Sequence, residues 1–514
     1  MGSSVSVVRG TNKKPVASEV LVSFFSQGGG HEGYLFTGYP IIGTAEGRHP
    51  IDALLVSPSL GIVVFDLIEG TRLGDYQSRQ DDSANKLEAR LRPHAELVER
   101  RRLKIPITTV SFAPAIPTGE TLSSGEYLLA NVETLSSGLS RAKWVDPQIG
   151  VYEAAVSAIQ NITAIRKSRI KRTVVHADSK GAKLKRLEDS IATLDTLQSR
   201  AVVETVDGVQ RIRGLAGSGK TVVLALKAAY LHAQHPEWRI AVTFNTRSLK
   251  GQFRRFINNF SVEQTGEEPD WQSLRILSAW GAPGGGERDG LYHEFCQAHG
   301  KEYLDYRGAK ARFGTDSAFA SACELAIQGC SEGKPLYNAI LVDESQDFPP
   351  EFLRLCFHAL DKNKRLVYAY DELQNLSGAS LPPPEEIFGK LPDGTPVVKF
   401  DEPLPGEPRR DVILEKCYRN SRPVLATAHA LGFGVYREPP EGATTGLVQM
   451  FDHSELWEEI GYRVNEGQIR DGTEVTLYRT EDTSPKFLEE HSPVAELVQF
   501  ICFNNREKQA EWLV

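Results

Sequence analysis

The stretch GLAGSGKT, Gly214 to Thr221, determines the fold of the central part of the chain. It fits the pattern G-x-x-x-x-G-K-[ST], and it stands between a short apolar strand, VQRIRG, and a segment with helical spacing, VVLALKAAYLHA. Glycines allow successive backbone N–H groups to turn inward around a phosphate, and the helix that follows directs its positive N-terminus at the same anion. The sequence therefore predicts a strand–loop–helix unit that binds a nucleoside triphosphate.

The residues of this loop have predicted roles. Lys220 is expected to contact the β- and γ-phosphates, and Thr221 to hold Mg²⁺. The residues predicted to bind the triphosphate are Gly214, Ala216, Gly217, Ser218, Gly219, Lys220 and Thr221. Gln198, sixteen residues before Gly214, is expected to contact adenine, because an amide pairs with the N6 and N7 edge as donor and acceptor together. Taken alone, Gln198 is equally consistent with a surface glutamine.

A second motif, NAILVDESQDF (338–348), carries adjacent carboxylates. Four apolar residues in a row predict a buried parallel strand, which delivers Asp343 and Glu344 to its carboxyl end, where open α/β sheets bind ligands. Asp343 is expected to stay ionised and hold Mg²⁺ through its water shell, and Glu344 to take a proton from the attacking water. Gln346 and Asp347 extend the polar run.

Length and composition limit the remaining possibilities. A chain of 514 residues is too long for one core, and a prior of roughly one domain per 100–200 residues predicts three or four. No apolar run approaches the roughly 20 residues of a membrane span, and the N-terminus lacks an apolar signal segment, so we expect a cytoplasmic protein with no membrane partner. The net charge of −8 limits any nucleic-acid surface to a local patch.

The cysteines give no indication of a metal site. The sequence has Cys296, Cys323, Cys330, Cys356, Cys417 and Cys502. They show no C-x-x-C spacing and no histidines at zinc-ligand distances, so we expect reduced and mostly buried thiols.

GLAGSGKT, DESQD and the segment around Gln198 together resemble the motor core of UvrD/Rep-like superfamily 1 helicases, over roughly Leu187 to Ser421. The resemblance implies ATP and Mg²⁺ as cofactors and DNA as the partner. AVTFNTRSL (241–249) is similar to a motif whose Phe244, Asn245 and Thr246 would contact single-stranded DNA. LSAWG (277–281) is similar to the next such motif, with Trp280 able to stack on a base or, in the alternative, to belong to the core.

The same resemblance implies two further contacts with the γ-phosphate. LVYAYDELQNL (366–376) is similar to a strand that ends in Asp371, with Gln374 placed to sense the γ-phosphate; Tyr370 departs from the small residue usual before that Asp. LEKCYRNSRPV (414–424) is similar to a motif whose Arg419 would reach the γ-phosphate across a cleft, from a second RecA-like domain. Glu344, Lys220, Gln374 and Arg419 are thus the expected catalytic residues.

Residues 1–145 are expected to form a separate α/β domain, with helices at 17–27 and 86–102 and a strand pair in 51–69. Glu19, Asp52 and Asp66 lie on these elements, and the arrangement resembles the nuclease-related NERD-type domain of the PD-(D/E)xK nuclease class, in which strand acids bind Mg²⁺. Asp52 and Asp66 are therefore a possible second metal site. The family's lysine is replaced by Ile68, followed by Glu69. An active nuclease, a degenerate nuclease fold kept for DNA binding or docking, and chance patterning of strand-end acids all remain open.

Residues 146–190 are expected to be a basic helical connector. Its cations between 166 and 186 are Arg166, Lys167, Arg169, Lys171, Arg172, Lys180, Lys183, Lys185 and Arg186, against the single acid Asp178. Such a run is either a solvated helix face or a patch that follows the phosphates of a nucleic acid.

The expected fold class is α/β: a restriction-endonuclease-like domain, then a RecA-like P-loop NTPase core with a parallel sheet at 191–410. A helical 1B insertion is expected at about 250–335, and 411–514 would begin a second RecA-like domain. Within that last part, 453–467 and the end of the chain are expected to be helical, with strands at 447–452 and 474–480. Because the chain ends at Val514 within a predicted helix, we expect a truncated sequence or a cleft completed by a partner.

These expectations combine into one function and two rivals. The first is an ATP-dependent DNA translocase or helicase that couples hydrolysis to movement on single-stranded or partly duplex DNA, in bacterial DNA processing or antiviral defence. The second is a DNA nuclease that an ATPase domain gates or loads. The third is a nucleotide-sensing scaffold that docks a protein partner, such as a nuclease or defence subunit.

Overall fold

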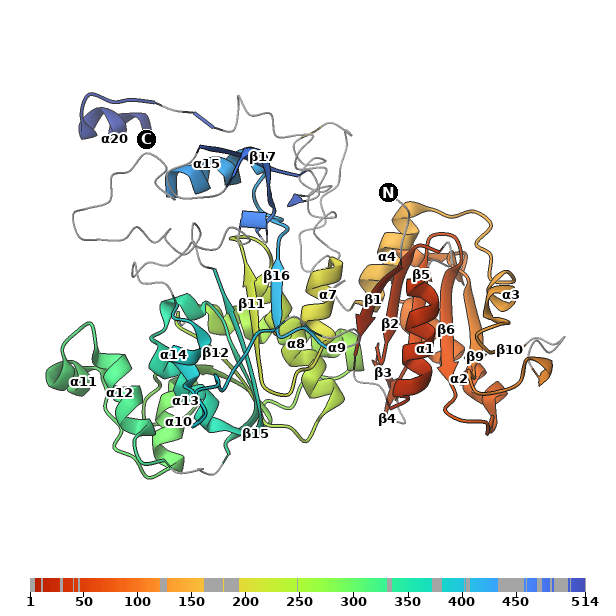
Figure 1. Ribbon diagram of the computed structural model, residues 1–514, viewed down its shortest axis with the longest axis horizontal. Helices are drawn as coiled ribbons and strands as arrows, with labels where there is room; N and C mark the ends of the chain where they lie inside the picture. Colours follow the sequence, from red (N-terminus) through yellow and green to blue (C-terminus); the bar gives the residue numbers. More distant parts are fainter. Residues whose placement is uncertain are drawn as a thin grey trace. The chain divides into compact units, whose positions relative to one another are not determined.

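The computed structural model shows two compact units (Figure 1). The first comprises Met1–Lys171, Ala192–Arg213 and Gly219–Ile413, and the second comprises Arg172–Ile191, Gly214–Ser218 and Leu414–Val514. The structure describes residues 5–10, 13–27, 31–39, 41–44, 47–120, 127–160, 179, 194–246, 248–330, 335–371, 381–401, 403, 407–432, 457–458, 460–468, 474–480, 483–484, 498–499 and 501–513.

The N-terminal part of the first unit contains a mixed six-stranded sheet in the order β1-β2-β5-β6-β9-β10. The strands are β1 (Val5–Arg9), β2 (Gly33–Thr37), β5 (Ala53–Ser57), β6 (Gly61–Leu67), β9 (Ile107–Phe112) and β10 (Leu128–Ala130). β5 and β6 form the predicted antiparallel pair, and the β1/β2, β6/β9 and β9/β10 pairs are parallel. Every residue of β5 and β6 is buried, so helices must cover both faces of the sheet.

Four helices provide that cover. α1 (Pro15–Ser26) and α3 (Leu135–Leu139) share a core with alternate residues of β5 and β6, namely Ala53, Leu55, Val63, Phe65 and Leu67. α2 (Tyr76–Leu91) contacts β6 and β9, and α4 (Ile149–Ile159) contacts β5. Asp66 belongs to the other set of alternate residues, and it hydrogen-bonds to α2. α1 confirms the helix expected at 17–27.

The helix predicted at 86–102 is wrong in its bounds. α2 begins at Tyr76, after Asp75 caps it by accepting from Ser78 N–H at 3.2 Å, and it ends at Leu91 because Pro93 cannot continue a helix. The chain then forms a short 3₁₀ turn (Ala95–Leu97) and a hairpin of β7 (Val98–Glu99) and β8 (Arg102–Leu103). Polar residues occupy the first turns of α2, so apolar periodicity indicated only its second half.

The second sheet of the first unit has the order β13-β12-β14-β15-β11-β16. Its strands are β11 (Val209–Gly214), β12 (Ile240–Phe244), β13 (Leu274–Ser278), β14 (Tyr337–Val342), β15 (Leu360–Tyr370) and β16 (Asp411–Leu414). The pairs from β13 to β11 are all parallel, and α8 (Lys220–Gln234), α9 (Leu249–Thr265) and α13 (Pro350–Ala359) are the connecting helices. The predicted α/β class with a parallel sheet is confirmed.

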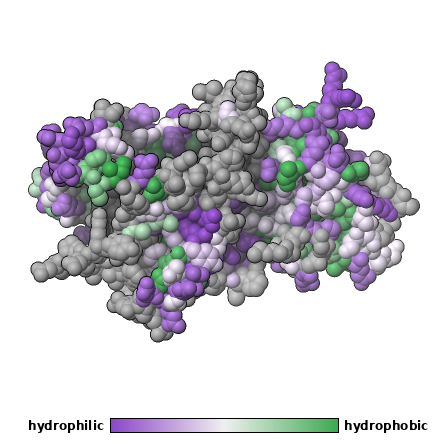
Figure 2. Space-filling model, turned by 90° about the horizontal axis from the view of Figure 1, so that it is seen from above, coloured by the Kyte–Doolittle hydropathy of each residue, from purple (hydrophilic) through white to green (hydrophobic). Residues whose placement is uncertain are grey.

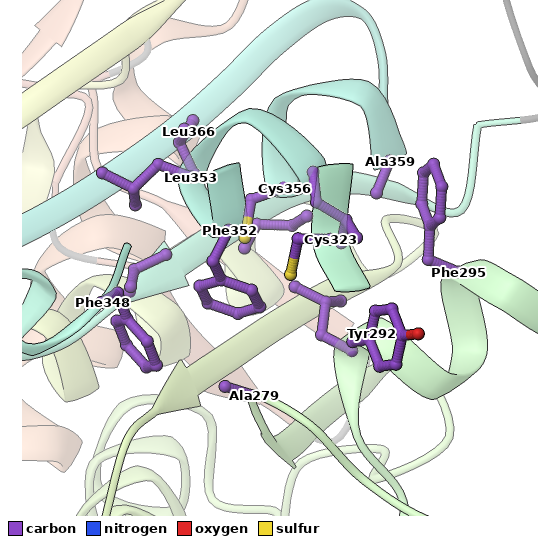
Figure 3. Packing of buried hydrophobic residues seen from close by; sticks show 14 of the residues in the cluster. Ala279, Tyr292, Phe295, Cys323, Phe348, Phe352, Leu353, Cys356, Ala359 and Leu366 are labelled. Carbon is purple, nitrogen blue, oxygen red and sulfur yellow. The ribbon is translucent and has the colours of Figure 1, made fainter. Parts of the chain in front are cut away.

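The segment predicted as a helical insertion, 250–335, is only partly separate from this sheet. β13 lies within it and forms the edge strand, and the helices that follow are α10 (Leu291–Ala298), α11 (Tyr306–Phe313) and α12 (Ala318–Ile327). Figure 3 shows how they pack: Cys323 of α12 lies beside Phe352 and Cys356 of α13, and Tyr292 of α10 belongs to the same buried cluster. The helices thus share the core of the sheet, and the expected insertion boundary at 250 is too early.

The cysteines are free thiols, as expected, and four of the six are buried. Burial raises the pKa of Cys323 and Cys356 well above the ordinary value, and that of Cys296 to about 11. Thiols of this kind are poor nucleophiles at neutral pH. They contribute to packing in the core of Figure 3.

In the second unit, α15 (Arg422–Gly432), β17 (Tyr462–Gly467), β18 (Val475–Arg479) and α20 (Arg506–Leu513) are present. The strand at 474–480 and the C-terminal helix were expected. The helix predicted over 453–467 is wrong for Tyr462–Gly467, which form β17 and pair antiparallel with β18, whereas 457–458 are helical. Gly461 has φ +92°, which interrupts a helix, and the guanidinium of Arg479 lies 5.0 Å from the ring of Tyr462. The strand predicted at 447–452 lies outside the described residues.

On the face seen in Figure 2, hydrophilic side chains predominate among the described residues, and apolar ones form separate groups between them. In the described ranges, every helix is too short or too polar to span a lipid bilayer.

Within the first unit, the N-terminal sheet contacts the helices beside β11. Arg200 of α7 (Thr196–Val203) donates from Nε to the carbonyl of Val7 at 2.9 Å, and the rings of Tyr39 and Tyr230 lie 5.7 Å apart. A Cβ built on Gly10 would lie 2.8 Å from Tyr230 Oη and 2.9 Å from the carbonyl oxygen of Thr37. The backbone at Gly10 therefore approaches α8 more closely than a larger residue permits.

We predict that Gly10→Ala destabilises the first unit by about 1–3 kcal/mol, because the added methyl group meets backbone as well as side chain. Urea unfolding measures the change. Gly150→Ala is the matched control, since no atom lies within 4 Å of its Cβ position. Equal stability of the two variants would contradict the close approach.

Candidate functional site

The glycine loop has the predicted strand–loop–helix structure. β11 ends at Gly214 and α8 begins at Lys220, with Gly219 in the left-handed conformation at φ +89° immediately before the helix. Gly217 has φ +84°. Gly219 has no side chain with which to cap α8, so the helix N-terminus is left to bind an anion through its backbone N–H groups.

Polar side chains from three elements meet at the start of α8. Thr221 Oγ1 donates to Asp343 Oδ2 at 2.8 Å, and Lys220 Nζ lies 3.5 Å from Asp371 Oδ2. Asp343 and Asp371 follow the adjacent strands β14 and β15, and Lys220 is only 7% exposed. The structure therefore brings together four of the residues singled out from the sequence.

Asp343 lies in an unusual electrostatic environment. It is fully buried, and this burial, with a smaller effect of the neighbouring Glu344, raises the pKa of its carboxyl to about 6. The hydrogen bond from Thr221 and the charge of Lys220 act in the opposite direction. Among the described residues, none donates a hydrogen bond to Oδ1 of Asp343. A buried carboxylate oxygen of this kind is suited to a cation or its water shell.

Glu344 is held in a strained conformation. Its φ of +49° lies in the left-handed region, which costs a non-glycine residue on the order of 1 kcal/mol and is most common at functional sites. Gln346 donates from Nε2 to Glu344 Oε2 at 2.7 Å and accepts through Oε1 from the Asp371 N–H at 3.1 Å. Gln346 thus connects the ends of β14 and β15, a role that its place in the motif alone did not indicate.

Gln198 lies beside the glycine loop. It is 5% exposed, and its Nε2 is 2.8 Å from the position of a Cβ on Gly219. With Asp195 it forms a capping box at the start of α7. Lys227 of α8 donates to the carbonyls of Ala201 and Glu204 at the other end of α7, and burial lowers the pKa of Lys227 to about 7. Both ends of α7 are thus fixed.

In the second unit, residues 417–419 contact the glycine loop. Tyr418 N–H donates to the Gly217 carbonyl at 3.0 Å, and Cys417 Sγ donates to the Ala216 carbonyl at 3.1 Å. A Cβ on Gly217 would lie 2.5 Å from Cβ of Arg419. The backbone of Arg419 therefore lies beside the loop, and its contact with the γ-phosphate stays a prediction. The contact of Cys417 was not foreseen, since no sequence pattern distinguishes it from a core thiol.

The residues predicted to contact DNA have different environments. Phe244 is fully buried and stacks on Phe253 at 5.6 Å, so its ring belongs to the core and the prediction for this side chain is wrong. Asn245 and Thr246, which follow at the carboxyl end of β12, are exposed. Trp280 donates from Nε1 to the Leu304 carbonyl at 2.9 Å and stacks on a phenylalanine at 4.6 Å, which favours the alternative of a core residue.

A pocket of about 380 Å³ lies along β13 and the first turns of α9. Its lining includes Lys250, Arg254 and Arg275, and the guanidinium of Arg254 lies 4.9 Å from the ring of Trp271. Lys250 pairs with Glu287 at 3.0 Å and Arg275 with Asp289 at 2.7 Å, and both acids line the pocket, so most of this positive charge is neutralised there. Cations combined with an aromatic ring are typical of nucleic-acid contacts.

Several predicted residues lie outside the described part of the chain. They are Gln374 and the basic residues Arg166, Lys167, Arg169, Lys171, Arg172, Lys180, Lys183, Lys185 and Arg186, together with Asp178. In the N-terminal domain, Asp52 and Asp66 lie close together, as predicted, and Lys14 Nζ is 2.6 Å from Asp52 and 3.6 Å from Asp66.

Comparison with protein-family models and with curated protein sequences finds no match for this chain.

We predict that Asp343→Asn stabilises the metal-free protein at neutral pH. The folded-state pKa of about 6 exceeds the ordinary 3.8, so between these values the folded protein binds a proton that the unfolded chain has released. The free energy of unfolding therefore falls as pH rises from about 4 to 6, by at most about 3 kcal/mol. Asparagine removes this loss.

Urea unfolding in EDTA measures the effect, with exposed Asp316→Asn as the control. We expect the Asp343→Asn variant to exceed the wild type in stability at about pH 7.5, and the difference to vanish below about pH 4. A variant that is less stable than the wild type at the higher pH would show that the buried charge is compensated.

Proposed function

We propose that the chain is an ATP-dependent motor on DNA, a translocase or helicase of the UvrD/Rep-like superfamily 1 type. The observation that supports this most strongly is the meeting of Lys220 and Thr221, at the start of α8, with Asp343 and Asp371 at the ends of adjacent parallel strands. Carboxyl ends of parallel strands are where open α/β sheets bind nucleotides. RecA-like organisation of this sheet and a nuclease-related N-terminal domain are part of the same proposal.

The residues fit a triphosphate with its metal. Thr221 supplies a hydroxyl oxygen, and Asp343 a buried carboxylate whose Oδ1 receives no hydrogen bond from the described residues. Hard oxygen ligands of this type suit Mg²⁺. When bound, Mg²⁺ neutralises negative charge on the β- and γ-phosphates. Lys220 would exchange its contact with Asp371 for the phosphate oxygens, since the two anions compete for one ammonium group.

Glu344 is the group we assign as general base. It follows Asp343 directly, its left-handed backbone turns it away from the strand direction, and Gln346 holds one of its carboxylate oxygens. A carboxylate fixed in this way can orient water and accept its proton. A movement of Asp371 would also move Glu344, because the amide of Gln346 is hydrogen-bonded to both residues.

The nucleic acid would pass the carboxyl ends of β12 and β13. Exposed Asn245 and Thr246 follow β12, and the pocket with Lys250, Arg254 and Trp271 begins beside them. Cationic groups bind the phosphates and the indole ring offers a face to a base. Phe244 also lines this pocket, but its ring is fully buried against Phe253, and Trp280 packs against core residues, so the proposal assigns neither side chain to the nucleic acid.

Two variants test the proposal. Glu344→Gln should bind ATP with unchanged affinity but hydrolyse it at least about 100-fold more slowly, because only the base is removed. Lys220→Ala should lose ATP binding. Fluorescent-nucleotide titration and DNA-stimulated phosphate release measure the two effects, with Glu386→Gln as the control on an exposed glutamate. Normal turnover by Lys220→Ala would refute the motor.

We also predict that Cys417 positions the glycine loop. Cys417→Ala removes the thiol that donates to the Ala216 carbonyl, and should weaken ATP binding by about fivefold, the equivalent of one hydrogen bond of about 1 kcal/mol. Cys417→Ser retains a donor and should bind ATP nearly as the wild type does. If both variants bind equally well, the thiol contributes only packing.

A further inference from the structure

The two aspartates predicted as a metal site in the N-terminal domain already have protein partners. Asp66, 6% exposed, accepts Arg79 Nε on Oδ1 and Arg79 Nη2 on Oδ2, each at 2.9 Å. Ser111 Oγ donates to Oδ2, also at 2.9 Å. This is a bidentate pair of the kind that is strongest between arginine and a carboxylate. Both oxygens that a metal ion would use are thus engaged.

Lys14 occupies the place of a shared cation. Its Nζ lies 2.6 Å from Asp52 Oδ2 and 3.6 Å from Asp66 Oδ1, between the two carboxylates. Asp52 Oδ2 also accepts the Leu67 N–H at 3.0 Å. Two aspartates therefore face two cationic side chains, Lys14 and Arg79, and the charges balance without a metal ion. Among the described residues, no three His, Cys, Asp or Glu side chains lie together as metal ligands would.

The other residues of the predicted nuclease site, Ile68 and Glu69, also have structural roles. Glu69 Oε1 accepts the N–H groups of Val16 at 2.8 Å and Ala17 at 3.2 Å, which caps the first turn of α1. Ile68, at the position where the nuclease pattern has lysine, packs in an apolar cluster with Ala113 and Leu129.

The polar network continues from Asp66 into α2 and the neighbouring strands. Ser111 accepts from Gln80 Nε2 at 3.0 Å, and Gln80 Oε1 accepts from Thr109 Oγ1 at 2.9 Å. Gln80 also donates to the Leu128 carbonyl at 2.8 Å and is 1% exposed. Asp66 is therefore the centre of a network that holds α2 on β6, β9 and β10.

We propose that this acid pair is a metal-independent clamp, in which Lys14 and Arg79 take the place of the metal ion and fix α1 and α2 to the N-terminal sheet. The clamp occupies both carboxylate oxygens of Asp66 and Oδ2 of Asp52. A divalent ion would have to displace an ammonium group at 2.6 Å and a bidentate guanidinium group, both already paired with the carboxylates. The clamp is independent of the nucleotide site, since its residues and those of the glycine loop are different.

Mn²⁺ binding by the full chain tests the proposal. The Asp343→Asn variant is used so that the proposed nucleotide site lacks its carboxylate ligand, and the free Mn²⁺ signal in electron paramagnetic resonance gives the bound fraction. We expect no bound Mn²⁺. Mn²⁺ that is bound and then lost on adding Asp52→Asn would overturn the proposal. Mn²⁺ that stays bound after that change is held at another site, which supports the clamp.

A second measurement does not depend on metal. Lys14→Met should lower the Tm by a few degrees in EDTA, and Mn²⁺ should not restore it, because the lost cation is part of the fold. Lys13→Met, one residue earlier and exposed, is the matched control and should leave the Tm unchanged. A Lys14→Met variant as stable as Lys13→Met would overturn the clamp.

Discussion

The carboxylate of Asp343 is the group on which the central part of the structure depends. Burying an ionised carboxylate costs several kcal/mol unless partners compensate, and here Thr221 and Lys220 in the first turn of α8 offset only part of that cost. The end of β14 and the start of α8 must therefore stay together. The glycine loop connects β11 to that turn, so its conformation must keep the start of α8 beside the end of β14.

The N-terminal domain solves a similar electrostatic problem differently. Asp66 is nearly as buried as Asp343, but both of its oxygens receive hydrogen bonds from Arg79. Asp343 has one oxygen held by Thr221, while no described residue donates to the other. The same type of side chain thus closes a structural network in one sheet and, in our proposal, keeps a ligand position in the other. The two aspartates differ in how many hydrogen bonds the described residues donate to their carboxylate oxygens.

Local patterns predicted the parts that depend on neighbouring residues in the sequence. The glycine loop, the apolar strand before Asp343 and the strand pair of 51–69 follow from spacing alone, and the structure contains all three. The bounds of α2 were missed because its first turns are polar, and β17 because Gly461 interrupts the apparent helical pattern. In the first case the apolar periodicity is missing from the start of the helix, and in the second a single glycine outweighs it.

Contacts between residues far apart in the sequence could not be predicted from local patterns. Lys14 precedes Asp52 by 38 residues and Cys417 follows Ala216 by 201, so no motif connects them. Phe244 and Trp280 were assigned to DNA by their place in a motif, yet both rings pack in the core. Whether an aromatic ring faces solvent depends on what the rest of the chain places over it, and spacing does not contain that information.

Helix α7 links two sites that the sequence treats separately. Its first turn carries Gln198 beside Gly219, its middle donates through Arg200 to the first strand of the N-terminal sheet, and Lys227 holds its last carbonyls. In our proposal Gln198 belongs to the nucleotide site, so a substitution at the edge of the N-terminal sheet that displaces α7 would also displace Gln198, without any change to a residue that touches the nucleotide.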